Sequence, residues 1–261
     1  MLQPQLCTKY PKYSLVASAT CITFWLSIAI IASPAIAKPP TSPFGLGLDF
    51  FQVSRGISRC PTTIIGNAIA PEDGGRTLSS KPTFYLYVEN LEGSQAKSYR
   101  AIFFLREGST VQSKIAYRVV GNSKKLGLLK FTLPDDAPGL PMGTDMRWQV
   151  RLELPYNNEI NINSFVRLEQ NAEVTRAIRQ ASSNLEKARI YAHYYYWYDA
   201  FDAYSQWLEA NPSDRTARQE RSAMMLASQV ATSSEKIKCT LVSDIPIDRI
   251  ESKKPELLLS P

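Results

Sequence analysis

Hydrophobic and polar residues alternate most regularly in the segment 147–154, RWQVRLEL. The apolar positions are Trp148, Val150, Leu152 and Leu154, and the polar positions are Arg147, Gln149, Arg151 and Glu153. Successive side chains of a β-strand point to opposite faces, so this period of two predicts an antiparallel strand with one buried face. The segment 160–168 repeats the pattern after an Asn-rich turn.

Five further segments of strand length precede these two. They cover residues 62–70, 82–89, 99–106, 111–120 and 127–133. Aromatic and β-branched runs bounded by turn residues are typical of strands. About seven short strands within ~110 residues predict an immunoglobulin-like antiparallel β-sandwich over residues 59–170. The Pro-rich connection 134–143 is expected to join the two sheets.

From residue 171 onward the apolar period changes to three or four residues, which predicts helices. The expected helices cover 172–192, 196–210 and 214–230. Pro212 ends the second helix, because proline cannot continue a helix and disfavours the helical conformation of the preceding residue. Ser213 can cap the third helix. Strands followed by helices, rather than alternating with them, favour an α+β fold.

The end of the first expected helix and the second expected helix together resemble a tetratricopeptide repeat. The matching residues are Ala188, Tyr191, Ala200, Tyr204 and Pro212. Trp207 stands where the repeat has a small residue. A stable solenoid needs at least about three such units. We therefore expect one degenerate tetratricopeptide-like hairpin within a three-helix segment, residues 171–230, that packs on the sandwich.

Aromatic residues are densest between Ile190 and Asp214. The candidate binding or seam aromatics are Tyr194, Tyr195, Trp197, Tyr198 and Trp207. Monomeric proteins avoid apolar patches of this size, so we expect these rings to fill a seam between the helices and the sandwich. Aromatic rings with polar tips also suit binding, which leaves a protein-binding or a glycan-binding surface as alternatives.

Two carboxylates, Asp199 and Asp202, lie three positions apart on the second expected helix. Paired carboxylates catalyse glycoside hydrolysis, but a pair on an amphipathic helix is more often a solvated face. We expect Asp199 to form a buried salt bridge with Arg167 or Arg189 that links helix to sandwich. His193, the single histidine, has no nucleophile motif beside it. The sequence therefore predicts no catalytic, cofactor-binding or metal-binding residues and no enzyme activity.

The first 37 residues are predicted to be a signal peptide. A basic start is followed by an uncharged stretch, 14–33, and by the small-residue cleavage site Ala35-Ile36-Ala37. The mature chain then begins at Lys38 and is periplasmic or secreted, with no stable membrane span. The alternative is an uncleaved anchor, since the apolar run approaches the ~20 residues that span a bilayer. Residues 38–58 are expected to form a flexible arm, and residues 231–261 a partly disordered tail.

The charge of the chain bears on which classes of molecule it can bind, and its cysteines bear on whether it forms a disulfide. The leader holds two lysines and no acids, so its removal lowers the formal charge from +6 to +4. Nucleic-acid binding requires basic residues on one face, whereas here they are interspersed with acids, so no nucleic-acid partner is expected. Cys60 and Cys239 remain after cleavage. An oxidising compartment permits a disulfide between them, but their distance decides whether it forms, and both outcomes stay open.

Several motifs together resemble one family. They are Arg55-Gly56 with Cys60, PTFYLYV at 82–88, FTLP at 131–134, MRW at 146–148, and the run from Ile190 through Trp197-Tyr198-Asp199-Ala200 to Asp214. Over residues 55–230 the chain resembles the cyanobacterial domain of unknown function 928 family. The resemblance implies an exported protein without an established activity and supplies no catalytic residues. The family usually has a second cysteine after the strand with Trp148. Leu154 occupies that neighbourhood here, so the pairing that the resemblance implies does not carry over, and Cys239 is the only possible partner for Cys60.

These features favour a non-catalytic exported module that binds another protein of the cell envelope or extracellular space. The alternative is a carbohydrate-binding or envelope-remodelling accessory protein that uses the tyrosine-rich hairpin. No cofactor is expected. Exposure of the tyrosines separates the two functions, because glycan binding needs several of them together on an open face.

Overall fold

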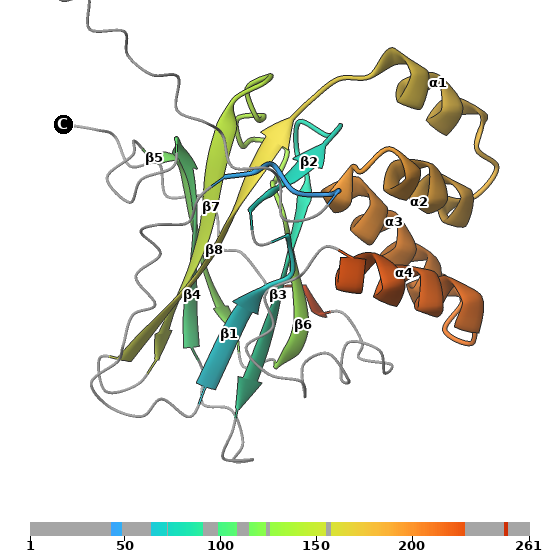
Figure 1. The fold of residues 1–261 in the computed structure, drawn as a ribbon. Helices are drawn as coiled ribbons and strands as arrows, with labels where there is room; N and C mark the ends of the chain where they lie inside the picture. Colours follow the sequence, from blue (N-terminus) through green and yellow to red (C-terminus); the bar gives the residue numbers. More distant parts are fainter. Residues whose placement is uncertain are drawn as a thin grey trace, which may run out of the picture. The chain divides into compact units, whose positions relative to one another are not determined.

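The computed structural model describes residues 43–48, 64–71, 73–90, 99–108, 115–123, 126–154, 158–227 and 248–249. This part of the chain contains two β-sheets and four helices, which confirms the predicted α+β class (Figure 1). None of the helices in these ranges has the length and apolar character that a membrane crossing requires. The expected signal peptide and both Cys60 and Cys239 lie outside the described residues.

The larger sheet, sheet A, has five strands in the order β2-β8-β7-β4-β5. Their bounds are Gly75–Thr77 for β2, Tyr99–Glu107 for β4, Ile115–Ser123 for β5, Asp145–Leu154 for β7 and Asn158–Leu168 for β8. All neighbours pair antiparallel except β2, which runs parallel to β8. The short β2 therefore forms the edge of sheet A beside the helices.

The smaller sheet, sheet B, has the order β1-β3-β6-β9. Its strands are β1 (Ile64–Ala68), β3 (Thr83–Asn90), β6 (Gly127–Thr132) and β9 (Asp248–Arg249). The first three pair antiparallel, and β9 adds two residues parallel to β6. Sheet B thus joins segments from both ends of the described chain.

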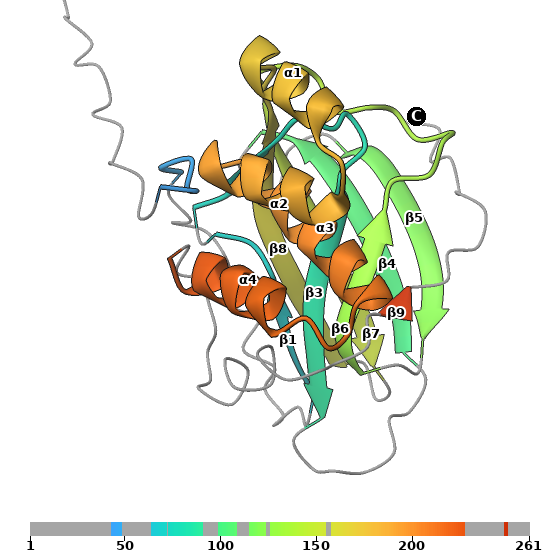
Figure 2. The ribbon, with the colours of Figure 1, turned by 90° about the vertical axis from the view of Figure 1, so that its right-hand side faces the viewer.

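The main core lies between the two sheets. The Phe84 ring on β3 lies 5.2 Å from both the Phe103 ring on β4 and the Trp148 ring on β7. Phe103 also stacks on Phe131 of β6 at 4.3 Å. On the opposite face of β3, Tyr85 meets the helices. The helical layer therefore packs beside sheet B, and α3 also reaches the β2 edge of sheet A (Figures 1 and 2).

Each of the seven expected strands corresponds to a strand of the structure, with ends that differ by a few residues. The sequence did not predict β2 and β9, which are too short to show any alternation. The antiparallel strand expected at 147–154 is confirmed, but its polar face is solvated only at Arg151 and Glu153, because Arg147 and Gln149 are buried. This strand, β7, lies in the middle of sheet A, where neighbouring strands flank both polar side chains.

The helical layer contains four helices rather than the three expected. They are α1 (Ala172–Gln180), α2 (Asn184–His193), α3 (Trp197–Ala210) and α4 (Arg215–Ala227). The single helix predicted over 172–192 is interrupted at Ala181, whose backbone is extended. Ser183 then caps α2 by accepting the Glu186 N–H at 3.1 Å, and the Glu186 carboxylate accepts the Ser182 N–H at 2.7 Å. This Ser-x-x-Glu capping signal was present in the sequence.

The described part of the expected flexible arm, residues 43–48, is packed against the fold. Phe44 is only 6% exposed and contacts the rings of Tyr195 and Trp197. Gly45 forms an antiparallel bridge with Gly75 at the start of β2. The prediction of flexibility is therefore corrected for these six residues.

Candidate functional site

The first turn of α3 inserts two large aromatic side chains where the helical layer meets both sheets. Trp197 is completely buried, and its indole Nε1 donates to the carbonyl of Ile69 at 3.4 Å. Tyr198 is 1% exposed. Its hydroxyl donates to the carbonyl of Phe165 at 2.7 Å and accepts the indole N–H of Trp148 at 2.8 Å. Both polar tips are thus satisfied inside the seam, as buried tyrosine and tryptophan require.

The close approach of α3 to β2 depends on a glycine. A Cβ atom built on Gly75 would lie 3.0 Å from the Cβ of Trp197 and 3.2 Å from the Tyr198 ring. The absence of a side chain therefore lets the helix and the strand approach closely. Burial raises the pKa of the Tyr198 hydroxyl well above its ordinary value, so this phenol stays protonated.

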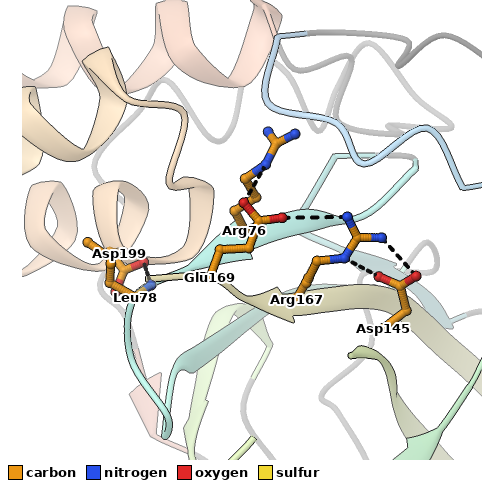
Figure 3. Close-up of polar contacts among 6 residues, drawn as sticks. All are labelled: Arg76, Leu78, Asp145, Arg167, Glu169 and Asp199. Carbon is orange, nitrogen blue, oxygen red and sulfur yellow. Dashed lines mark hydrogen bonds and ion pairs between the residues drawn. The ribbon is translucent and has the colours of Figure 1, made fainter. Parts of the chain in front are cut away.

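Asp199 links the helix to sheet A, but not through the salt bridge predicted from the sequence. Its carboxylate accepts the backbone N–H of Leu78 at 2.9 Å, immediately after β2 (Figure 3). Burial raises the pKa of Asp199 to about 6, and the hydrogen bonds from Leu78 and Thr77 oppose that rise. The link is therefore a charge-assisted hydrogen bond to the main chain.

The arginines expected to pair with Asp199 have other partners. Arg167 forms a bidentate pair with Asp145 at 2.6 and 2.8 Å, and Glu169 lies 3.5 Å from Arg167 and 3.2 Å from Arg76 (Figure 3). These charges form a row across β2, β8 and β7, in which the Asp145 hydrogen bond raises the Arg167 pKa.

The other predicted partner, Arg189 on α2, pairs with Glu220 on α4 at 2.9 Å. Because both arginines are engaged elsewhere, Asp199 is left without either predicted counter-charge.

A second carboxylate holds the next turn of α3 on sheet B. Asp202 accepts the Tyr85 hydroxyl at 2.6 Å and the Gln206 amide at 2.8 Å. Tyr85 also meets the Phe201 ring edge-on at 4.7 Å. Burial and the nearby Asp202 charge raise the pKa of Tyr85. Both members of the acidic pair therefore contact groups of the sheet region, Asp199 at the Leu78 amide and Asp202 at Tyr85, so the pair is not a solvated face.

The remaining candidate aromatics lie at the periphery. Trp207 is half-buried and donates to Asp214 at 2.8 Å, so it connects α3 to the start of α4 rather than to the sheets. Tyr194 donates to Glu173 of α1 at 2.8 Å. Tyr195 is 45% exposed, and His193 is exposed at the end of α2. Of the five predicted residues, only Trp197 and Tyr198 lie deep in the seam.

Tyr195 adopts an unusual backbone conformation, with φ of 63°. It follows α2, and the next amide, that of Tyr196, donates to the carbonyl of Tyr191 at 2.9 Å. This is the Schellman arrangement, in which the left-handed position is usually glycine. A side chain there costs ~1–2 kcal/mol. The Tyr195 ring offsets part of that cost through its edge-on contact with Phe44 at 5.5 Å.

These contacts are suited to holding layers together. A pKa near neutrality can mark a catalytic acid, but the hydrogen-bond partners of the Asp199 carboxylate are the Leu78 amide and the Thr77 side chain. Within the described ranges, no group of three or more metal-ligating side chains is placed to hold a metal ion. The seam is therefore a structural clamp, with an exposed rim at Tyr194 and Tyr195.

Sequence analysis missed the residues that receive α3. Tyr85, Trp148 and Leu78 supply the partner groups for Asp202, Tyr198 and Asp199. Alternation along β3 does place Tyr85 on the face opposite Phe84, which was a usable signal. Nothing local in the sequence marks the amide of Leu78 as a partner for a carboxylate 121 residues later.

Comparison with known proteins identifies one family. The family described as Domain of Unknown Function (DUF928) matches residues 53–237. A comparison with curated proteins finds no match. The matched range contains the residues of the seam between α3 and the sheets, from Ile69 to Asp202.

Proposed function

The chain belongs to the Domain of Unknown Function (DUF928) family, and we propose that it is a non-catalytic, exported module that binds another protein of the cell envelope or extracellular space. The proposal includes cleavage of the leader after Ala37 and a periplasmic or secreted mature chain. The sheets are proposed to be an immunoglobulin-like sandwich, and α2 with α3 a degenerate tetratricopeptide-like hairpin.

One observation carries this proposal. Most of α3 is buried against the rest of the fold, whereas α1 and α2 beside it expose polar residues to solvent. Asn184 at the start of α2 bonds Gln206 near the end of α3 at 3.3 Å, as expected for an antiparallel hairpin. Arg176 and Arg179 of α1 are exposed. Helical hairpins held in this way commonly present binding surfaces, although the fold alone supports this only by analogy.

The burial pattern favours a protein partner over a glycan. Tyr196, Trp197 and Tyr198 are at most 4% exposed, so they offer no stacking surface to a sugar. The exposed rim retains Tyr194 and Tyr195, which are too few for the tyrosine platform of the alternative function. A carbohydrate-binding or envelope-remodelling role would need another surface.

Affinity capture from the envelope fraction tests this function. We expect the mature chain to retain a specific polypeptide, and the double variant Arg176→Glu/Arg179→Glu to lose it by reversing the charge on the exposed face of α1. The matched control, Asp135→Lys/Asp136→Lys, changes exposed charges in the loop after β6 and should retain the polypeptide. Retention of glycan without a polypeptide, or no retention beyond an unrelated exported protein, contradicts the proposal.

A further inference from the structure

The packed arm, residues 43–48, occupies a recognition site formed by the edge of sheet A and the end of α2. We propose that this arm site also takes an extended segment of a partner protein with an aromatic residue followed by glycine, and that the arm is its competitor within the chain. The inference rests on the proposed protein-binding function and identifies one surface and one kind of partner for it.

The first element of the arm site is an aromatic pocket. The Phe44 ring meets the Trp197 ring edge-on at 5.7 Å and the Tyr195 ring edge-on at 5.5 Å. Trp197 is fixed in the seam, and Tyr195 reaches Phe44 only by keeping a left-handed backbone that glycine would adopt more easily. A strained side chain that is retained for one contact is typical of a binding site.

The second element requires a glycine at the position after the aromatic residue. A Cβ atom on Gly45 would lie 2.2 Å from the carboxylate oxygens of Asp73, which is far inside van der Waals contact. Asp73 is itself only 3% exposed, so its side chain has little room to move away. Any segment that replaces the arm in this register must therefore have glycine there.

The third element recognises the main chain. The carboxylate of Asp73 accepts the backbone N–H of Gly47 at 2.9 Å, and Gly45 pairs with Gly75 as an antiparallel bridge. A Cβ on Gly74 would lie 2.7 Å from the Cβ of Phe165 and 3.1 Å from the Leu46 side chain, so glycine there leaves room for both residues. Addition of an extended segment to an exposed strand edge is a recurring mode of peptide recognition.

The arm is suited to exchange with a partner segment. Its contacts with this site include those of the Phe44 ring, the Gly45 bridge, the Gly47 hydrogen bond and the packing of Leu46 on Gly74. In the sequence, residues 49–63 separate the arm from β1. An attached arm competes at the effective concentration set by its linker, so a partner with the same pattern gains access when the arm is weakened.

A peptide-binding assay on the full chain tests the arm site. The probe is a fluorescent, end-blocked peptide with the arm sequence Pro-Phe-Gly-Leu-Gly-Leu. We expect it to bind the Phe44→Ala protein at least ~tenfold more tightly than the wild-type protein, in which the intact arm competes. The matched peptide with alanine in place of its first glycine should show no measurable binding to either protein.

Two further variants separate binding from folding. Tyr195→Gly in the Phe44→Ala background removes the pocket wall while relieving the left-handed strain, so the protein should fold and bind the probe at least ~tenfold more weakly. Gly45→Ala offers a second way to displace the arm, and it should admit the probe as Phe44→Ala does. Circular dichroism and thermal melting check that each variant is folded.

Three outcomes overturn the inference. In the first, the folded Phe44→Ala and Gly45→Ala proteins fail to bind the probe. In the second, the glycine and alanine peptides bind equally well. In the third, the wild-type protein forms dimers and the Phe44→Ala substitution makes them dissociate. The last would make a second copy of the chain, rather than another protein, the source of the segment. If the probe fails while envelope capture still retains its polypeptide, the arm site is wrong and the protein-binding function stands.

Discussion

Replacing Trp197 by alanine is expected to lower the free energy of unfolding by about 3–5 kcal/mol. The indole is completely buried where α3 meets β2, contacts the rings of Phe44 and Phe201, and donates to the Ile69 carbonyl. Its removal leaves a cavity and an unpaired carbonyl in the seam. Urea denaturation, followed by circular dichroism, measures the loss.

The matched control for this substitution is Trp207→Ala. Trp207 belongs to the same helix but is half-buried, and it contacts Asp214 rather than the sheets. We expect it to cost less than about 2 kcal/mol, as is usual for a residue outside the core. Equal losses for Trp197→Ala and Trp207→Ala would show that the first turn of α3 is not the anchor of the helical layer.

Replacing Asp199 by asparagine is expected to stabilise the protein at pH 7.5 by about 2–3 kcal/mol. Burial raises the pKa of this carboxyl from its ordinary 3.8 to about 6, so the folded state binds the proton more readily than the unfolded state. The contribution of Asp199 to stability is therefore most favourable below pH 4 and declines as the pH rises to 6. Asparagine keeps an oxygen acceptor for the Leu78 amide but carries no charge.

Unfolding measured from pH 3.5 to 7.5 provides the test. The stability difference between Asp199→Asn and the wild-type protein should vanish near pH 4 and reach its maximum above pH 6. Asp214→Asn is the control of opposite sign. The Ala217 amide and the Trp207 indole lower the Asp214 pKa, so this substitution should destabilise the protein at pH 7.5. Parallel curves for Asp199→Asn and the wild-type protein would refute a raised pKa at Asp199.

The raised pKa means that Asp199, unlike a surface acid, makes the stability of the fold depend on pH. A protein gains stability by neutralising a buried carboxylate that has no counter-charge, yet this chain retains one between α3 and β2. The charge of Asp202 raises the pKa of Asp199 further, whereas the hydrogen bond from the Leu78 backbone amide lowers it. The Asp199 charge in turn raises the pKa of Tyr191 on α2. The folded state is consequently favoured when Asp199 is protonated.

The limits of prediction from this sequence have physical causes. Alternation identified two strands, and aromatic or β-branched runs between turn residues identified five more, because each of these segments is long enough to show such a pattern. It missed β2, whose three residues include Gly75, although this strand is where the helix makes its closest approach. A regular apolar period over 172–192 concealed the interruption at Ala181, although Ser183, which caps α2, lies inside that range.

The sequence predicted some of the residues of the candidate site, but not the groups with which they form hydrogen bonds. The high density of aromatic residues in the sequence predicted that Trp197 and Tyr198 lie in a seam, and both are buried there. Density did not distinguish them from Tyr195, whose exposure follows from the turn geometry at the end of α2. The Asp199 partner was wrong for a different reason: an arginine is a conspicuous candidate in a sequence, whereas every residue except proline offers a backbone amide.

Hydroxyl-radical footprinting of the folded protein tests most directly whether the aromatic stretch of α3 belongs to the interior. Mass spectrometry then compares the oxidation rates of the individual tyrosines. The structure predicts rapid oxidation of Tyr195 and strong protection of Tyr196 and Tyr198, with protection lost in urea. Oxidation of Tyr196 and Tyr198 at the rate of Tyr195 in the folded protein would contradict a clamp between the helices and the sheets.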